Sequence, residues 1–266
     1  MPKSPKYLLI GSIEASSGKS AIILGLSNQL HQTGLNVAYG KPLGKSLRES
    51  EGSLIEEDVE FITQSLNLSP NQIVPTLLGL NETTLQQRLS GKDTTDYQKS
   101  LKSEYLQDGL GDLVVLEGPG NLSEGNLFDL SLMQVAETLD AGIILVCRYK
   151  SLLAIEGVLA AKQLVGERLI GVVINDVPPE HLQAVTNTMS PFLEQQDIPV
   201  LGVLPNSKLL RSVTVRELFQ QLNAEVLCRK DRLNLLVESL AIGAMNVNAA
   251  VKYFRKRQNM AVVTGG

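Results

Sequence analysis

Residues 7–20, with the sequence YLLIGSIEASSGKS, combine residue types that together can bind a polyphosphate. A short apolar run leads into a loop of small residues, and Gly18-Lys19-Ser20 opens a predicted helix. Small residues let backbone N–H groups approach phosphate oxygens, and the helix N-terminus adds a favourable dipole. The Lys19 ammonium can reach the β- and γ-phosphates, and the Ser20 hydroxyl can ligate Mg²⁺. The stretch therefore predicts a nucleotide site.

The loop departs from the usual phosphate-binding pattern at one position. G-x-x-x-x-G-K-[ST] requires a glycine where this chain has Ile13. Gly-Lys-Ser also occurs by chance in loops, and residues 44–46 repeat it with no strand immediately before them. The alternative interpretation is an ordinary strand-to-helix turn. We favour the nucleotide site because strand, loop and helix fall where the motif demands, with Ser16, Ser17 and Gly18 presenting their backbone to the phosphates.

The composition is typical of a soluble globular protein. The chain has 266 residues, of which 43% are hydrophobic, so it can form one large domain or a large and a small one. Its net charge of −4 argues weakly against a nucleic acid or an anionic membrane as partner. No stretch is apolar enough for a membrane span or a signal peptide, so we expect a cytoplasmic location. The cysteines and histidines lack metal-ligand spacing, and Cys147 is expected to be a buried thiol.

Short β-rich runs alternate with amphipathic helical stretches up to about residue 205, a pattern typical of a parallel sheet covered by helices. We predict a doubly wound, mainly parallel α/β sheet of the P-loop NTPase type. Polar residues 43–91 show little strand character and are expected to form an insertion over the site. The predicted strands are 7–10, 36–39, 112–116, 142–147, 169–174 and 200–203. The predicted helices are 19–32, 56–66, 96–108, 130–138, 152–165 and 179–195.

A change of composition near residues 204–207 predicts a second, smaller α/β module, which divides the chain into domains at 1–206 and 207–266. The chain stops directly after a predicted strand, so we expect this module to be truncated or incomplete. Its predicted elements are a helix at 214–222, a strand at 225–227, an apolar run at 237–242, a helix at 247–257 and a strand at 260–263.

Further chemistry-bearing residues stand at the carboxyl ends of predicted strands, where sheets of this type bind ligands. Lys41 follows the second strand and would point toward the phosphates, although a solvated loop lysine is the alternative. Glu117 and Gly118 follow the third strand. The acid can orient a metal-bound water and the glycine leaves room for the γ-phosphate, whereas a plain turn would explain Glu117 poorly. Asn175, after the fifth strand, could hydrogen-bond an adenine edge or simply form a turn.

Asp58 lies in the acidic run Glu56-Glu57-Asp58 at the start of a predicted helix. It could supply a second contact to the metal. Acidic residues at a helix start also stabilise the helix dipole without any other role, so both interpretations stay open.

Taken together, these motifs resemble those of dethiobiotin synthetase and its relatives, the cobyric and cobyrinic acid amidases and the N-terminal part of long phosphotransacetylases. The resemblance covers about residues 6–205. It rests on the order of Ser17-Gly18-Lys19-Ser20, Gly40-Lys41-Pro42, Glu117-Gly118-x-Gly120, Asn175 and the run IPVLGVLP at 198–205.

Residues from Thr214 on resemble the DRTGG domain that follows this module in phosphotransacetylase-like proteins. The match includes Thr214-Val215-Arg216-Glu217, Gly243-Ala244-Met245 and the final Val-Val-Thr-Gly-Gly. The acetyl-transferring domain of phosphotransacetylases is absent from this sequence, so acetyl transfer is not expected.

The resemblance implies ATP and Mg²⁺ as ligands and a fold of the P-loop type. It places Lys19 and Ser20 on the phosphates and the metal, Asp58 and Glu117 near the metal, Lys41 facing the phosphates, and Asn175 on the base. It also makes a homodimer an expectation. The chain departs from the family at Pro119 and Asn121, in the loop after Glu117. A trans-acting lysine of the partner-sensing ATPases would fall at Ile13 and is excluded.

Two functional hypotheses follow. In the first, the protein is a nucleotide-sensing regulatory module with slow or no hydrolysis that signals through a protein partner or its own C-terminal module. In the second, it is an ATP-dependent ligase that activates a carboxylate or carbamate by phosphorylation, with Lys19, Lys41 and Glu117 as the catalytic residues. We favour the first because of the DRTGG-like module and the altered loop after Glu117.

Overall fold

The structure of the chain is a computed structural model that describes residues 6–45, 47–50, 53–107, 109–207, 209–244, 252, 254–255 and 258–265. The chain divides into two compact units, Met1–Pro205 and Asn206–Gly266, and each is described by itself. Among the described residues, no helix has the length and apolar character needed to cross a membrane.

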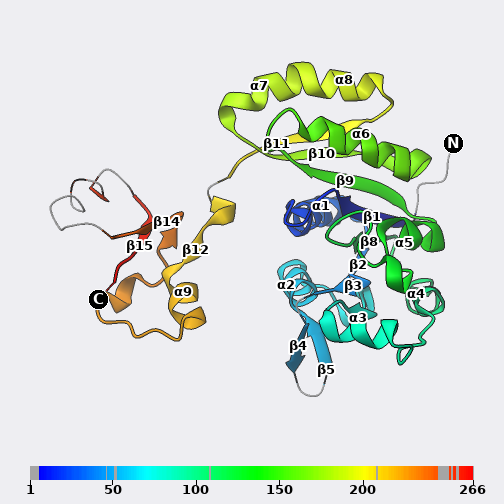
Figure 1. The fold of residues 1–266 in the computed structure, drawn as a ribbon, viewed down its shortest axis with the longest axis horizontal. Helices are drawn as coiled ribbons and strands as arrows, with labels where there is room; N and C mark the ends of the chain where they lie inside the picture. The colour runs from blue at the N-terminus through cyan, green and yellow to red at the C-terminus, as the bar shows by residue number, and fades with distance from the viewer. Residues whose placement is uncertain are drawn as a thin grey trace. The chain divides into compact units, whose positions relative to one another are not determined.

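The first unit is built on a seven-stranded sheet whose neighbouring strands all run parallel (Figure 1). The strand order is β11-β10-β9-β1-β8-β2-β6. The strands are β1 (Tyr7–Ser12), β2 (Val37–Gly40), β6 (Ile73–Val74), β8 (Leu113–Glu117), β9 (Gly142–Arg148), β10 (Leu169–Val177) and β11 (Val200–Pro205).

The chain path creates a point of divergence beside β1. From β1 the chain moves outward to β2 and β6, returns to β8, and then passes to the other side of β1 to form β9. The loops after β1, β8 and β9 therefore meet where the strand order reverses, and in open α/β sheets this crevice is the usual ligand site.

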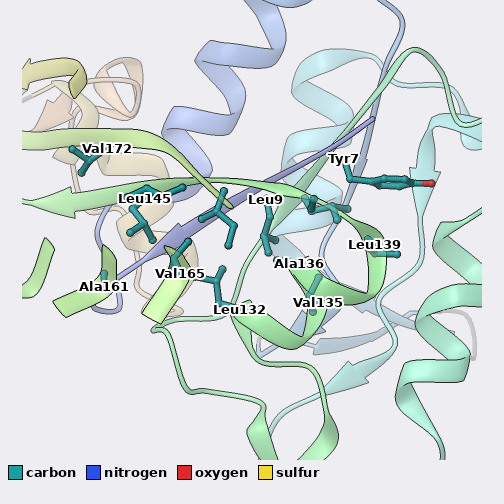
Figure 2. Close-up of a cluster of buried hydrophobic side chains, with 14 of the residues drawn as sticks. Tyr7, Leu9, Leu132, Val135, Ala136, Leu139, Leu145, Ala161, Val165 and Val172 are labelled. Carbon is teal, nitrogen blue, oxygen red and sulfur yellow. The ribbon is translucent and has the colours of Figure 1, made fainter. Parts of the chain in front are cut away.

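Helices cover both faces of the sheet, and successive residues of β1 supply a core on each side. Leu9 belongs to the core beneath one set of helices, whereas Leu8 and Ile10 belong to the core on the opposite face. Figure 2 shows Leu9 and Leu145 from the sheet in the same cluster as the helix residues Leu132, Ala136 and Val165. The helices are α1 (Lys19–Gln32) and α2 (Glu57–Leu66) over one face, and α3 (Glu82–Leu89), α4 (Tyr97–Tyr105), α5 (Leu132–Leu139), α6 (Ala154–Val165), α7 (Leu182–Ala184) and α8 (Ser190–Gln195) toward the other.

The predicted doubly wound parallel fold is confirmed. Each of the six predicted strands is present and ends slightly later than predicted, and the helix predicted at 19–32 has the predicted bounds. The prediction of little strand character in residues 43–91 was wrong. This segment contributes the edge strand β6 and two small sheets, β3 (Leu43–Gly44) with β7 (Leu78–Gly79) and β4 (Leu47–Ser50) with β5 (Ser53–Glu56). Strands this short have no alternating pattern to detect.

The helix predicted at 179–195 is interrupted. It begins as a 3₁₀ turn at Pro179–His181, continues through α7, and widens into a π-helical turn at Val185–Met189 before α8. Pro191 lacks the N–H that a regular helix would use there. Within this widened turn, the Ser190 hydroxyl donates to the Val185 carbonyl at 3.1 Å.

The second unit contains α9 (Val215–Gln221) and two small sheets, β12 (Val213–Thr214) with β13 (Leu236–Val237) and β14 (Ser239–Ile242) with β15 (Met260–Val263). Thr214 and Glu217 form a capping box on α9, which confirms the helix predicted there. The strand predicted at 225–227 was wrong: these residues pair with no strand, and Leu227 is 86% exposed. The helix predicted at 247–257 lies largely outside the described residues.

Replacement of Phe128 tests how far the stability of the first unit depends on its larger core. Its side chain is fully buried and meets the Tyr97 ring edge-on, with centroids 5.7 Å apart. We expect Phe128→Ala to lower the free energy of unfolding by about 3–5 kcal/mol in urea denaturation followed by circular dichroism. Phe61, which is 58% exposed on α2, supplies the matched control, and Phe61→Ala should cost about 0.5 kcal/mol or less. Equal losses in the two variants would contradict this core assignment.

Candidate functional site

A cavity of about 430 Å³ lies at the carboxyl ends of β1, β2 and β8. It brings together the loop after β1, the start of α1, and charged side chains from three other segments. Its lining residues are Ala15, Ser16, Ser17, Gly18, Lys19, Ser20, Ala21, Lys41, Lys45, Asp58 and Glu117. All of the predicted phosphate-loop, lysine and carboxylate positions therefore line one cavity. The other two predicted positions, Gly118 and Asn175, are not among its lining residues.

The backbone of the loop is held in a conformation that only glycine adopts easily. Gly18 has a φ of 96°, and a Cβ at this position would lie 2.3 Å from the Asn175 amide nitrogen. That nitrogen donates to the Ser17 carbonyl at 2.9 Å. In this structure, Asn175 thus supports the loop; contact with a base stays a prediction.

The loop also offers polar groups that fit a phosphate. The Ser17 hydroxyl oxygen is buried and has no hydrogen-bond partner among the described residues. No described side chain caps the start of α1, so the first amides of this helix are available to an anion. Buried polar groups normally find partners, and a bound polyphosphate would supply them here.

Lys19 is buried in the floor of the cavity, with 8% of its surface exposed. Its ammonium donates to the Ser12 hydroxyl at 2.9 Å. That hydroxyl in turn lies 2.9 Å from the Glu14 carbonyl oxygen and 3.2 Å from the Gly120 carbonyl oxygen. Burial lowers the pKa of Lys19, because the charged form loses water that a single hydroxyl replaces poorly. An anionic ligand in the cavity would restore that lost stabilisation.

Lys41 stands at the centre of a cluster of carboxylates. Its ammonium lies 2.6 Å from Glu56 Oε1 and 3.7 Å from Glu117 Oε1, and it also pairs with Asp58. Burial opposes the charge on Lys41, but Glu117, Asp58 and Glu56 outweigh it and raise the pKa of this lysine. The cluster joins the end of β2, the start of α2 and the end of β8.

Glu117 is 4% exposed and, besides its ion pair with Lys41, accepts two hydrogen bonds. The Tyr39 hydroxyl donates to Oε2 at 3.1 Å, and the Ser20 hydroxyl lies 3.3 Å from Oε1. Burial raises the pKa of Glu117, against the opposing effect of Lys41. Gly118 follows directly, where a Cβ would lie 3.1 Å from the Ile10 carbonyl, so the chain turns tightly against β1.

The sequence analysis missed four residues of this site: Ser12, Tyr39, Lys45 and Glu56. Glu56 is 2% exposed, caps α2 by accepting from the Asp58 and Val59 amides, and holds Lys41. Its position in the acidic run with Asp58 was a signal, but the run alone did not reveal which acid is buried. Ser12 and Tyr39 are ordinary strand residues in sequence.

Glu14, inside the loop, does not line the 430 Å³ cavity and instead pairs with Lys150. Both residues line a second cavity of about 300 Å³, together with Ile13, Arg148 and Cys147. Cys147 is the buried thiol predicted from sequence, and burial raises its pKa to about 11.

Comparison with known proteins identifies the family of the fold. The model of the AAA domain family AAA_26, a dethiobiotin synthetase-like P-loop family, matches residues 6–214. The chain belongs to this family. The DRTGG domain model matches residues 217–266, which gives the domain order found in the N-terminal region of phosphate acetyltransferases. The fold is thus that of a P-loop NTPase, and such a domain implies binding of a nucleotide with Mg²⁺.

Similar curated proteins are longer than this chain. The phosphate acetyltransferase of Synechocystis sp. is 25% identical over 268 residues, which span 97% of this chain and 37% of that protein. The cobyric acid synthase of Vibrio parahaemolyticus is 27% identical over 88% of this chain and 52% of its own length. The phosphate acetyltransferase of Deinococcus radiodurans is 26% identical over 94% of this chain and 36% of its own length.

Two solved structures are similar to parts of the chain. Chloroplast FtsY from Physcomitrella patens has a TM-score of 0.47 and 17% identity, and the match covers 76% of this chain and 59% of that one. The septum site-determining protein MinD from Pyrococcus horikoshii, complexed with Mg-ADP, has a TM-score of 0.46 and 17% identity over 78% of this chain and 84% of that one.

The buried position of Glu56 generates a stability prediction. Glu56→Ala removes both the cap of α2 and one partner of the buried Lys41, so we expect a loss of about 3 kcal/mol in the free energy of unfolding. The adjacent Glu57 is exposed in the first turn of α2, and Glu57→Ala should cost only about 0.5 kcal/mol. Urea denaturation measures both variants, and a Glu56→Ala protein as stable as Glu57→Ala would contradict the role assigned to Glu56.

Proposed function

We propose that the protein binds ATP·Mg²⁺ in the cavity at the phosphate loop and acts as a nucleotide-sensing regulatory module with slow or no hydrolysis. The observation that carries this proposal is the convergence of Lys19, Lys41, Ser20 and Glu117 on one cavity. Lys19 and Lys41 would bind the phosphates, and the loop amides at the start of α1 would complete their hydrogen bonds. The orphaned Ser17 hydroxyl supports the same assignment.

Ser20, Glu117 and Asp58 would face the metal. Among the described residues, no cluster of three or more His, Cys, Asp or Glu side chains is arranged to hold a metal ion by itself. Mg²⁺ commonly takes only one or two carboxylates and fills its remaining positions with phosphate oxygens and water. The donor set therefore fits an ion that arrives with the nucleotide, where its positive charge would stabilise the phosphates.

A DRTGG domain directly follows the P-loop domain, and this order favours a regulatory role over a self-contained enzyme. In this proposal, nucleotide occupancy of the first domain is reported to the second domain or to a protein partner. The loop after Glu117 supports this choice, because Pro119 and Asn121 replace the small residues that dethiobiotin synthetases carry near their acceptor.

The second candidate function is that of an ATP-dependent ligase of the dethiobiotin synthetase type. Lys41 favours it, since a buried lysine beside metal-facing carboxylates is suited to stabilise charge on a transferred phosphoryl group. Lys19, Lys41 and Glu117 would then be the catalytic residues, and a carboxylate or carbamate would be the acceptor.

Replacement of Lys19 tests the binding site in both functions. We expect Lys19→Ala to lower the affinity for ATP·Mg²⁺ by about 100-fold in calorimetric titration, because a charged hydrogen bond to phosphate is lost from a buried position. Lys92→Ala, at an exposed position, serves as the matched control and should bind like the unmodified chain. Unchanged ATP affinity in Lys19→Ala would refute the site.

Phosphate release from ATP·Mg²⁺ separates the two functions. It would be measured with and without diaminopelargonic acid plus bicarbonate, the acceptors of dethiobiotin synthetase, with Lys19→Ala as background. A sensor should bind ATP and release little phosphate under both conditions. Release that the acceptors stimulate would identify a ligase and refute the regulatory role.

A further inference from the structure

A third lysine, Lys45, lines the same cavity as Lys19 and Lys41. It belongs to the second Gly-Lys-Ser tripeptide of the chain, at residues 44–46, which has no strand-loop-helix context of its own. Strand β3 ends at Gly44, and the Lys45 amide lies 3.4 Å from Glu56 Oε1. The buried carboxylate that holds Lys41 therefore also positions the backbone of Lys45 at the cavity.

The Lys45 side chain is paired with Glu124 from the loop that follows β8. Glu124 Oε2 accepts a hydrogen bond from the Gly120 amide at 2.5 Å. A Cβ at Gly120 would lie 3.3 Å from the Lys45 ammonium, so this ion pair sits directly against the loop backbone. The pair thus connects the segment after β3 with the segment after β8.

The three lysines differ in how firmly they are held. Lys41 is buried among three carboxylates, and Lys19 is buried on the Ser12 hydroxyl. The Lys45 side chain is 52% exposed, and Glu124 is the carboxylate with which it pairs among the described residues. Glu124 is only 12% exposed, so water screens the pair from the lysine side alone. Glu124 keeps the Gly120 amide as a donor when the lysine moves, and a terminal phosphate with more charge can therefore compete with it for Lys45.

Hydrogen bonds also connect Lys45 to the phosphate-loop lysine. Lys19 donates to the Ser12 hydroxyl, which lies 3.2 Å from the Gly120 carbonyl oxygen. The Gly120 amide is held by Glu124, which is the partner of Lys45. Lys19 and Lys45 therefore approach the cavity from the two ends of one short network through Gly120.

We infer that Lys45 is a specificity-determining residue. Its ammonium gives up the ion pair with Glu124 and binds the terminal phosphate of a nucleoside triphosphate, so that the site discriminates ATP from ADP. This inference rests on the proposed function, because it requires nucleotide binding in the cavity. The ion pair with Glu124 opposes the movement of the Lys45 ammonium to the phosphate. The preference for ATP over ADP therefore depends on the competition between the Glu124 carboxylate and the terminal phosphate for this lysine.

Calorimetric titration with ATP·Mg²⁺ and with ADP·Mg²⁺ tests this role on the full chain. Lys45→Ala should weaken ATP binding about 10-fold and change ADP binding less than about two-fold, because only ATP carries the third phosphate. Lys45→Arg should keep most of the preference for ATP. Glu124→Gln retains an acceptor for the Gly120 amide but frees the lysine, so ATP affinity should rise about two- to five-fold with ADP affinity unchanged.

The outcomes separate this inference from the proposed function. A chain that binds ATP, but whose Lys45→Ala variant keeps the same ratio of ATP to ADP affinity, would overturn the inference alone. A loss of ATP affinity in Glu124→Gln would also overturn it, because the pair would then be structural. An unmodified chain that binds neither nucleotide would overturn both. Lys92→Ala, which should change neither affinity, is the control for loss of a lysine.

Discussion

The site depends on one buried charge, the Lys41 ammonium, and on the carboxylates that neutralise it. An isolated ammonium could not be buried at the end of β2, since removing it from water is too costly without partners. Glu117, at the end of β8, and Glu56, at the start of α2, bring those partners from different parts of the chain. Because Glu56 also caps α2, the pairing that stabilises Lys41 fixes the start of that helix and the position of Asp58.

The parallel sheet explains why these groups meet. Strands β1, β2 and β8 are neighbours or next neighbours, and their carboxyl ends open at the same edge. The phosphate loop, Lys41 and Glu117 each follow one of these strands, so the topology alone brings together two cations and an acid. The loop gains its shape from Gly18 and from the Asn175 amide of β10, which donates to the Ser17 carbonyl. A cavity that is lined by lysines and carboxylates and adjoins an uncapped helix start is therefore a consequence of the fold.

The sequence was sufficient for the features that repeat along the chain. Short apolar runs that alternate with amphipathic helices predicted the parallel fold. Polar residues directly after those runs predicted the convergence of Lys19, Lys41 and Glu117. It was insufficient where tertiary contacts decide. Glu56 and Glu57 are chemically alike, and only packing against Lys41 buries the first. Strand β6 is too short to show an alternating pattern of apolar and polar residues. Lys45 follows β3, and β3 is held by pairing with β7, a strand far along the chain that the sequence alone does not connect to it.

A crystal structure with Mg²⁺ and a non-hydrolysable ATP analogue tests the central claim most directly. We expect the phosphates to occupy the cavity between the phosphate loop and Lys41, with Mg²⁺ beside Ser20. Lys19 should exchange the Ser12 hydroxyl for a phosphate oxygen. An analogue bound elsewhere, while Lys19 still donates to Ser12, would contradict the account.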